Sequence, residues 1–532
     1  MLPSLVLGTL SSHSAAHNLA WAGQFADQFR AGILYPRWMA DSFDGLGGPA
    51  FYFYPPLPFW IDALVSIISL NALPVSYRLA ISTTLLLAAS GLAMHAWLAR
   101  ERVDRVMALL GALAYVAAPY HLIDHYIRGA YAEFAAYAFL PLAALAIRRI
   151  ADRRRGGIVI LALSYAALLL SHLPTAVLAS ATLLPAYVLF RAWRSAEPMA
   201  AAQLVARSAA GAVLGAGLAA IYLIPAASLQ EWIASEQLWI GGYRVETWFL
   251  LTPERWLKPT DMMVLIAWFA AAYVIAALGV LLLLRDDTSA ALPKAEAAFW
   301  ALLSLWCIVL MSGLLPWFWS AVPLLGKVQF PWRLMVVVEF STITGICLAW
   351  AGLASWLARL CLAAAGVTLV AGFAPLILGI AVRVEHGFHQ TVPSMQDAKE
   401  YLPAGYPQRP DAAYDDLSLG LLRDVPTIAC TPATRVCRAE SGRFGGMRID
   451  VEGETSTQVV LKRFWFPGWR IGESIVATAA EPLRLVSFAV PAGRLSAPLH
   501  RVAQPVEKWS LAVSAASLVL LIALMMLGRR RS

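Results

Sequence analysis

Three ionisable side chains lie close together in one otherwise apolar stretch of this chain. They are Asp124, Arg128 and Glu133, within the segment PYHLIDHYIRGAYAEFAAYAFLPL. An ionisable group between apolar runs is costly unless it has a task or a partner. On one unbroken helix, Asp124 and Arg128 share a face at i,i+4, whereas Glu133 points the opposite way. The three side chains therefore converge only if the helix breaks at Gly129.

These residue types can exchange protons and bind charged groups. A carboxylate can deprotonate an acceptor, so Asp124 and Glu133 are candidate catalytic groups, and Arg128 is a candidate substrate-binding cation. His172, in the SHLP corner, could face the same cavity as a third catalytic candidate. The alternatives are a structural ion pair with a glutamate at a helix N-terminus and, for His172, a hydrogen-bonding residue at a helix end.

Three further cations are candidates for holding a lipid phosphate. Arg333 in QFPWR is preferred, because its forked guanidinium matches phosphate oxygens and its aromatic neighbours indicate a membrane surface. Lys327 and Arg37 are secondary candidates. The alternative for all three is snorkelling of the charged end to lipid headgroups.

His13 and His17 are also spaced i,i+4, which could place both imidazoles on one helix face toward a substrate or a metal ion. No third ligand accompanies them, so no metal site is assigned, although a divalent metal stays open. Interfacial histidines without a special role are the alternative. The sequence contains no Walker loop and no HExxH motif, so nucleotide hydrolysis and zinc peptidase chemistry have no support.

The elements that must position these groups are membrane helices. Of the 532 residues, 60% are hydrophobic and 14% are charged, against roughly 25% charged in soluble domains. The net charge of +8 comes from short clusters beside apolar runs, which favours orientation in a bilayer and excludes a nucleic-acid-binding face. The clusters are Arg100/Arg102/Arg105, Arg148/Arg149 with Arg153/Arg154/Arg155, Arg191/Arg194 and Arg529/Arg530/Arg531.

We therefore predict a mainly α, polytopic helical bundle of about twelve spans. Residues 1–10 are too short to cross, 17–30 are expected to lie in the interface, and 57–71 to be interfacial or re-entrant. The spans are predicted near 77–99, 104–119, 130–148, 157–171, 173–192, 206–226, 262–284, 295–315, 332–352, 360–382 and 508–527.

The chain divides into a bundle over 1–382, a β-rich outer domain over 383–507 and a C-terminal span with a basic tail over 508–532. Strands are expected at 447–451, 457–464 and 483–490, which predicts a small β-sandwich. Cys430 and Cys437 are expected to form a disulfide in an oxidising compartment. The positive-inside rule places both termini in the cytoplasm and 383–507 in the periplasm, in a bacterial inner membrane.

Several motifs together resemble one family. LYPRW, GLGGPAFYFYPPLPFW, the Pro119 to Leu142 segment, SHLPT and KVQFPWR resemble bacterial membrane proteins labelled "6-pyruvoyl-tetrahydropterin synthase-related", which look like GT-C-fold glycosyltransferases. FWFPGW and VPAGRL are similar to the outer domain of YfhO-type proteins. PPLPFW is similar to an element of lipid A aminoarabinose transferases and protein mannosyltransferases.

The resemblance implies transfer of a sugar from a polyprenyl-phosphate donor to a lipid, glycan or protein acceptor at the outer face, with membrane lipids as surroundings. GT-C enzymes commonly carry an Asp shortly after the first span, whereas SSHSAAHN places Ser14 there. The alternative is therefore a catalytically inactive relative that binds a lipid-linked glycan or assists its export. A small-solute transporter is a third interpretation, although no paired, interrupted spans indicate inverted repeats.

Overall fold

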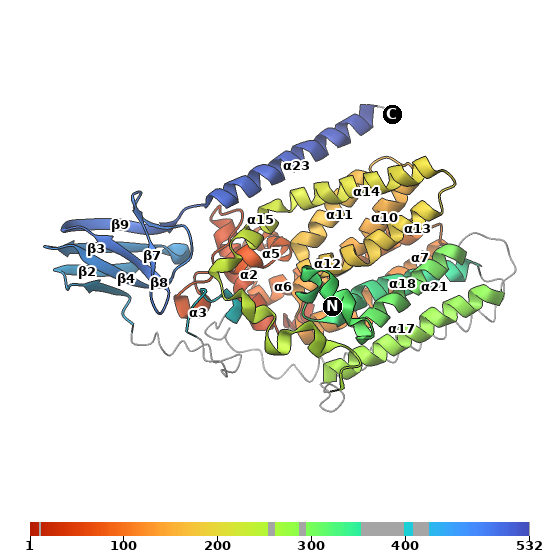
Figure 1. Ribbon diagram of the computed structural model, residues 1–532, viewed down its shortest axis with the longest axis horizontal. Coiled ribbons are helices and arrows are strands. Elements are labelled where there is room, and N and C mark those ends of the chain that lie inside the picture. The colour runs from red at the N-terminus through yellow and green to blue at the C-terminus, as the bar shows by residue number, and fades with distance from the viewer. Residues whose placement is uncertain (10–11, 254–260, 287–293, 353–397, 408–424, 531–532) are drawn as a thin grey trace.

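The computed structural model describes residues 1–9, 12–253, 261–286, 294–352, 398–407 and 425–530. A helical bundle forms one part of the molecule, and a β-domain lies at one end of it (Figure 1). The C-terminal helix α23 (Pro505–Arg530) runs from the β-domain back along the bundle. The predicted fold class, a membrane-type helical bundle with a β-sandwich near the C-terminus, is confirmed.

Within the described ranges, nine helical stretches are long and apolar enough to cross a membrane. Two predicted spans lack such a counterpart: α11 (Gly157–Ser171) is apolar but shorter, and 360–382 lies outside the described residues. The nine stretches are α6 (Val75–Arg100); α7 (Arg105–Val116), α8 (Pro119–Ile123) and η1 (Asp124–Arg128); α9 (Tyr131–Ala136) with α10 (Phe139–Ala151); α12 (Leu173–Ala181) with α13 (Leu183–Trp193); α14 (Pro198–Leu218); α17 (Asp261–Asp286); α18 (Lys294–Ser312); η6 (Pro331–Leu334) with α21 (Met335–Gly352); and α23.

The predicted span 206–226 is wrong in its limits. Two helices replace it, α14 and α15 (Ala220–Ser228), which meet at Ala219. Ser514 of α23 stabilises the junction: its hydroxyl accepts from the Ile221 amide at 2.8 Å and lies within hydrogen-bond distance of the Gly217 and Leu218 carbonyls. A side chain far along the sequence thus satisfies backbone groups that the helix break exposes.

The helix of the N-terminal region packs its apolar face against the rest of the protein. Helix α2 (Ala15–Arg30) buries Trp21 and Phe25 against α5 (Leu57–Ile68) and the aromatic loop before it. Their rings contact Phe51 with centroids 5.8 and 4.8 Å apart. The aromatic residues of 51–59 therefore supply a protein surface for the apolar face of 17–30, and the placement of this helix in the membrane interface stays a prediction. The short helices of this region are α1 (Leu2–Leu7), α3 (Ser42–Gly45) and α4 (Ala50–Phe53).

The segments between the longer helices are mostly short turns of helix. They are η2 (Gln230–Trp232), η3 (Ser235–Leu238), η4 (Gly241–Tyr243), η5 (Val245–Trp248), α19 (Pro316–Ala321), α20 (Pro323–Gly326) and η8 (Lys399–Tyr401).

The β-domain consists of two antiparallel sheets, with strand orders β1-β4-β8-β7 and β2-β3-β9-β5-β6. The disulfide Cys430–Cys437 is present and joins β1 of one sheet to β2 of the other. Strand β3 buries Met447, Ile449 and Val451 on alternate positions, as the predicted strand requires. The strands are β1 (Ile428–Thr431), β2 (Val436–Ser441), β3 (Met447–Gly453), β4 (Thr457–Phe464), β5 (Trp469–Ile471), β6 (Ile475–Val476), β7 (Thr478–Ala480), β8 (Leu485–Val490) and β9 (Gly493–Arg501), with the short turn η10 (Arg443–Gly445).

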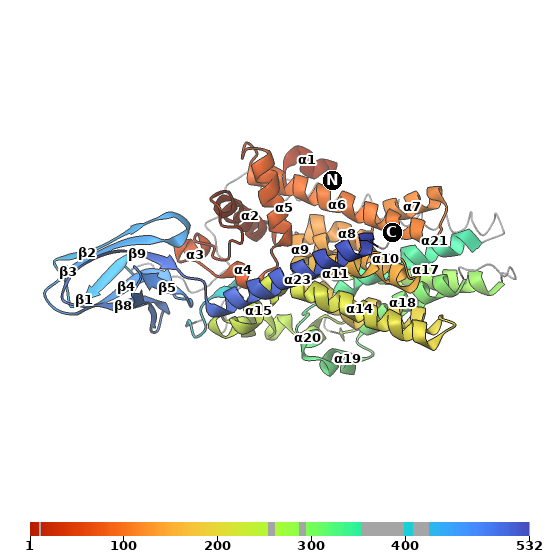
Figure 2. The same ribbon diagram turned by 90° about the horizontal axis from the view of Figure 1, so that it is seen from above.

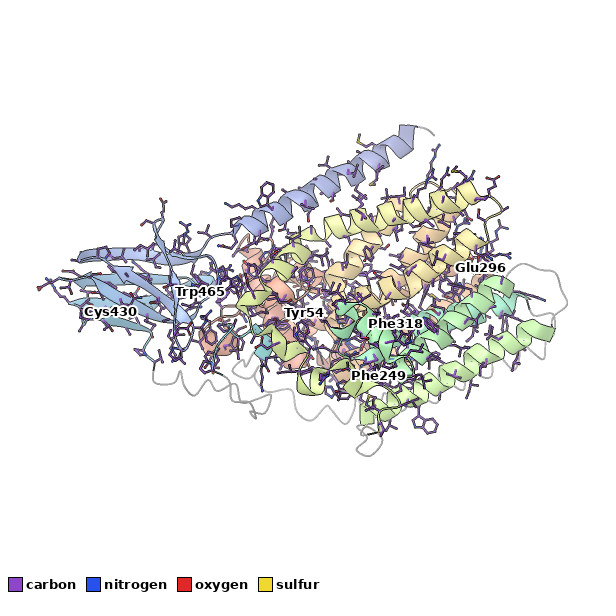
Figure 3. The ribbon with its side chains drawn as sticks, in the orientation of Figure 1. Tyr54, Phe249, Glu296, Phe318, Cys430 and Trp465 are labelled. Atoms are coloured by element: carbon purple, nitrogen blue, oxygen red, sulfur yellow. A yellow bond between two sulfur atoms is a disulfide. The ribbon has the colours of Figure 1, made fainter. Side chains whose placement is uncertain are left out.

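The β-domain packs against loops at one end of the bundle, and the view from above also shows it at that end (Figure 2). The Phe464 amide donates to the Leu46 carbonyl at 3.0 Å, and the rings of Trp38 and Trp469 meet edge to face at 5.2 Å. The opposite end of the bundle carries Glu296, which pairs with Arg148 and Arg191 (Figure 3). The Glu296 ion pairs with Arg148 and Arg191 thus lie at the end of the bundle opposite the β-domain.

Candidate functional site

The helix that carries Asp124 breaks where the convergence of the three ionisable residues requires it. Residues Asp124–Arg128 form one turn of π-helix, and Gly129 follows with a φ of 60° and a ψ of 31°. A π-turn of this kind is frequent at functional sites. A side chain at Gly129 would meet the hydroxyl of Ser12 at 2.2 Å, so the position demands glycine on steric grounds as well. Helix α9 then restarts at Tyr131 and brings Glu133 back toward Arg128.

Glu133 is the centre of the resulting charge cluster, which we define as Tyr120, Asp124, Arg128, Glu133, His172 and Arg333. Its Oε2 accepts from the Arg128 guanidinium at 2.8 Å and from Arg333 Nε at 3.2 Å. Its Oε1 accepts from the Tyr120 hydroxyl at 2.7 Å. Arg128 also donates to Asp124 Oδ1, so one guanidinium links both carboxylates.

His172 reaches the charge cluster from another helix break. It lies between α11 and α12 with an extended backbone, and its Nδ1 is 2.7 Å from the Thr175 hydroxyl. Its Nε2 lies 4.0 Å from Glu133 Oε2. The structure therefore gathers Asp124, Arg128, Glu133, His172 and Arg333 from three separate parts of the sequence.

The charge cluster is nearly closed to solvent. Asp124 and Glu133 are 0% and 1% exposed, and Arg128, His172 and Arg333 are each 8% exposed. Two carboxylates and two guanidiniums balance one another, which is how buried charges persist in a low dielectric. The sequence predicts a shared wet cavity for these groups. The described structure instead packs them directly against one another, because opposite charges satisfy each other at contact distance.

One atom of the charge cluster lacks a partner. Asp124 Oδ2 is buried and has no hydrogen-bond partner among the described residues. Asp124 lines a cavity of about 20 Å³ together with Ser12, Asn18 and His125. That volume holds about one water molecule. The neighbouring Ser14 amide donates to the Arg128 carbonyl at 3.0 Å, so the segment that carries Ser14 lies against the π-turn.

Glu339, which the sequence analysis missed, supports the charge cluster from α21. Its two carboxylate oxygens accept from the backbone amides of Tyr120 and His121 at 2.7 and 3.3 Å, at the start of α8. They also accept from the hydroxyls of Tyr137 at 2.9 Å and Tyr273 at 3.2 Å. A lone glutamate inside a predicted span was the available signal, since such a group is costly without partners.

The remaining candidates lie apart from Glu133. Arg37 donates to the Ile221 carbonyl at 2.8 Å and lies 3.7 Å from Glu507 at the start of α23. Lys327 is exposed and lies over the ring of Trp239 at 4.5 Å. Within the described ranges, neither side chain forms an ion pair with a member of the charge cluster.

The two N-terminal histidines do not share one helix face, because α2 begins only at Ala15. His17 belongs to α2, where its ring contacts Trp21 with centroids 5.9 Å apart. His13 precedes the helix, is exposed, and donates its amide to the Ile127 carbonyl. Partial burial, with Arg128 nearby, lowers the pKa of His13. Across the described ranges, no group of three or more His, Cys, Asp or Glu side chains is arranged to hold a metal ion.

Comparison with known proteins identifies the family but no characterised relative. No curated protein matches the chain. A model of the 6-pyruvoyl-tetrahydropterin synthase related domain, described as a membrane protein, matches residues 51–385. That range includes most of the spans, the π-turn and every member of the charge cluster. The chain therefore belongs to the membrane protein family of the 6-pyruvoyl-tetrahydropterin synthase related domain.

Proposed function

We propose that this membrane protein transfers a sugar from a polyprenyl-phosphate donor to a lipid, glycan or protein acceptor at the end of the bundle that carries the β-domain. One observation supports the proposal above the others: Oδ2 of Asp124 is buried without a hydrogen-bond partner among the described residues, and Asp124 lines a cavity of about 20 Å³. A general base needs a carboxylate oxygen that is not already saturated with donors. Both oxygens of Glu133 are engaged, so Asp124 is the better candidate.

In the proposed reaction, an acceptor hydroxyl attacks the anomeric carbon of the donor sugar. The acceptor oxygen forms the new glycosidic bond, the bond from the anomeric carbon to the phosphate oxygen breaks, and the hydroxyl proton goes to Asp124. The polyprenyl phosphate leaves with the bonding electrons, and a cation must stabilise its charge. Arg333 and the exposed Lys327, six residues apart on the KVQFPWR segment, are the proposed phosphate ligands.

The charges of the cluster can also hold these groups in place. Arg128 links Asp124 to Glu133, and Glu133 in turn holds Arg333. A base and a phosphate ligand are thereby joined through three consecutive ion pairs. Such pre-organisation is what electrostatic catalysis requires, since the groups need not reorient during the reaction.

The proposal is tested by mass spectrometry of lipids and glycans from cells with and without this protein. We expect one lipid or glycan species to lose a mass increment of a single sugar when the protein is absent. Re-expression of the wild-type chain should restore that species, and the Arg333→Ala chain at equal protein level should not. Identical lipid and glycan profiles with and without the protein would contradict sugar transfer.

A second candidate function is a catalytically inactive relative that binds a lipid-linked glycan or assists its export. Ser14 favours it, since this residue stands where the related enzymes carry an Asp. It predicts retention of a lipid-linked glycan by the purified protein with no turnover of the bound species. Appearance of a glycosylated product from the retained lipid would exclude this alternative.

A further inference from the structure

A second polar cavity, of about 590 Å³, lies where α2 meets the β-domain, apart from the charge cluster. One wall is the last two turns of α2 and the loop at residues 40–41, and the other wall is the turn at 442–444 between β2 and β3. Its volume falls within the roughly 300–1,000 Å³ typical of small-molecule sites. Figures 1 and 2 show α2 and α3 beside the β-domain, at the end of the bundle that carries it.

The lining is polar and its charges balance. Asp27 and Asp41 oppose Arg30 and Arg443, and Gln24 and Gln28 add amide groups. A phosphate would need an excess of cations, and a divalent cation would need converging carboxylates, but Asp27 is already paired with Arg30. Balanced charges and side-chain amides instead suit a neutral ligand with many hydroxyl groups.

The polar groups are held in place by the backbone of the adjoining loop. Gln24 Oε1 accepts from the Asp41 amide at 2.9 Å, and Gln28 donates to the Trp38 carbonyl at 2.8 Å. The amide nitrogen of Gln24 is buried and has no hydrogen-bond partner within the described parts of the chain. A buried donor of this kind costs free energy unless a ligand or water satisfies it.

An aromatic ring completes the cavity. Phe444 has a φ of 56°, a left-handed conformation that is an outlier for a bulky residue, and the Arg443 guanidinium lies over its ring at 5.0 Å. The next residue, Gly445, fixes the turn, since a side chain there would come within 2.9 Å of the Trp38 indole nitrogen. The backbone strain thus serves to present an aromatic side chain to a polar cavity.

We propose that this cavity binds a neutral carbohydrate of one or two sugar rings. Planar amides and carboxylates bind the ring hydroxyls, and Phe444 contacts the apolar face of a ring. The site goes beyond the proposed transfer reaction. It holds a glycan on the surface formed by α2 and the β-domain, and its occupancy does not depend on any member of the charge cluster.

The test is direct binding to the full-length protein in lipid nanodiscs, measured by saturation-transfer NMR and calorimetry. The probes are maltose, cellobiose, lactose and diacetylchitobiose, with inorganic phosphate as the anionic comparison. We expect millimolar binding of at least one disaccharide and none of phosphate. Binding of phosphate alone, or of no probe in the panel, would overturn the proposal.

Two variants separate binding from folding. Gln24→Ala should weaken disaccharide binding by about tenfold or more. Phe444→Gly relieves the left-handed strain, so it should fold at least as stably as the wild type and still lose about tenfold in affinity. Arg438→Ala, an exposed change on β2 outside the cavity, is the matched control and should bind normally. Equal affinity in all four proteins would overturn the proposal. Because no sugar transfer is measured, failure here is distinct from failure of the proposed function.

Discussion

Arg333 Nε donates to Glu133 Oε2 at 3.2 Å, although the two residues lie 200 positions apart in the chain. The same oxygen accepts from Arg128, so one carboxylate joins two cations from separate parts of the family-matched region. Both contacts require the helix break at Gly129, because an unbroken helix would turn Glu133 away from Arg128.

Glu133→Gln should be strongly destabilising. It leaves two buried guanidiniums facing a neutral amide, and breaking a buried ion pair in this way costs about 3–5 kcal/mol. Unfolding in detergent micelles measures the loss. The control is Asp27→Asn, which breaks an exposed pair with Arg30 and should cost less than about 1 kcal/mol. Equal losses in the two variants would show that the buried ion pairs of the charge cluster stabilise the fold no more than an exposed pair does.

Gly129→Ala should destabilise more than Gly156→Ala. Both glycines have positive φ, 60° and 77°, so each alanine carries a left-handed penalty of about 1–2 kcal/mol. Only Gly129 is also crowded, by Ser12, and overpacking adds about 1–3 kcal/mol. Thermal unfolding of the two variants side by side measures the difference. If the two variants have the same melting temperature, the close approach of Ser12 adds no cost to a side chain at position 129.

Glu339→Ala should cost about 3 kcal/mol or more, because it leaves four buried donors without their acceptor at once, each worth about 1–3 kcal/mol. Glu339→Gln retains one acceptor oxygen and should fall between the alanine variant and the wild type. Glu246→Ala, on an exposed turn, is the control and should leave the unfolding midpoint unchanged. A wild-type midpoint for Glu339→Ala would refute this role.

The stability of the end opposite the β-domain should depend on pH through Glu101, in the turn between α6 and α7. Burial raises the pKa of Glu101 from 4.5 to about 7, against the opposing effect of Arg148. The folded state therefore binds the Glu101 proton more tightly than the unfolded state does. The resulting stabilisation is complete below pH 4.5 and is lost as the pH rises through 7.

Glu101→Gln removes this titration. Relative to the variant, the wild type should lose stability between pH 5 and pH 8, by up to about 3 kcal/mol for a shift of this size. Parallel unfolding curves at the two pH values provide the measurement. A constant difference between the two proteins across that range would contradict the raised pKa.

Much of the architecture follows from local pattern. Apolar runs between arginine clusters predict the helices, and alternation at Met447, Ile449 and Val451 predicts β3, because one face of each element must be buried. The limits of α14 were not predictable, because they depend on Ser514 of α23. A hydrogen bond from a helix far along the chain produces no pattern in the local sequence.

The candidate site was predictable only in part. Asp124, Arg128 and Glu133 stand out as costly charges in apolar sequence, and their convergence could be stated as a condition on Gly129. Glu339 carries the same signal but was missed. Arg37 is a secondary phosphate candidate from the sequence, whereas its contact with Glu507 depends on the packing of α23 against the loop before α5. Such pairings are properties of the tertiary fold.

The most direct test of the account is sugar transfer by membranes that contain the Asp124→Asn chain, assayed with the lipid or glycan species that depends on this protein. Asp62→Asn is the matched control, because Asp62 is equally buried and also paired with an arginine, Arg78, at 3.2 Å. We predict that transfer falls at least about a hundredfold in Asp124→Asn at equal protein level, as expected for loss of a general base, while Asp62→Asn retains transfer in proportion to its folded amount. Full transfer by Asp124→Asn would contradict the assignment of Asp124 as the base.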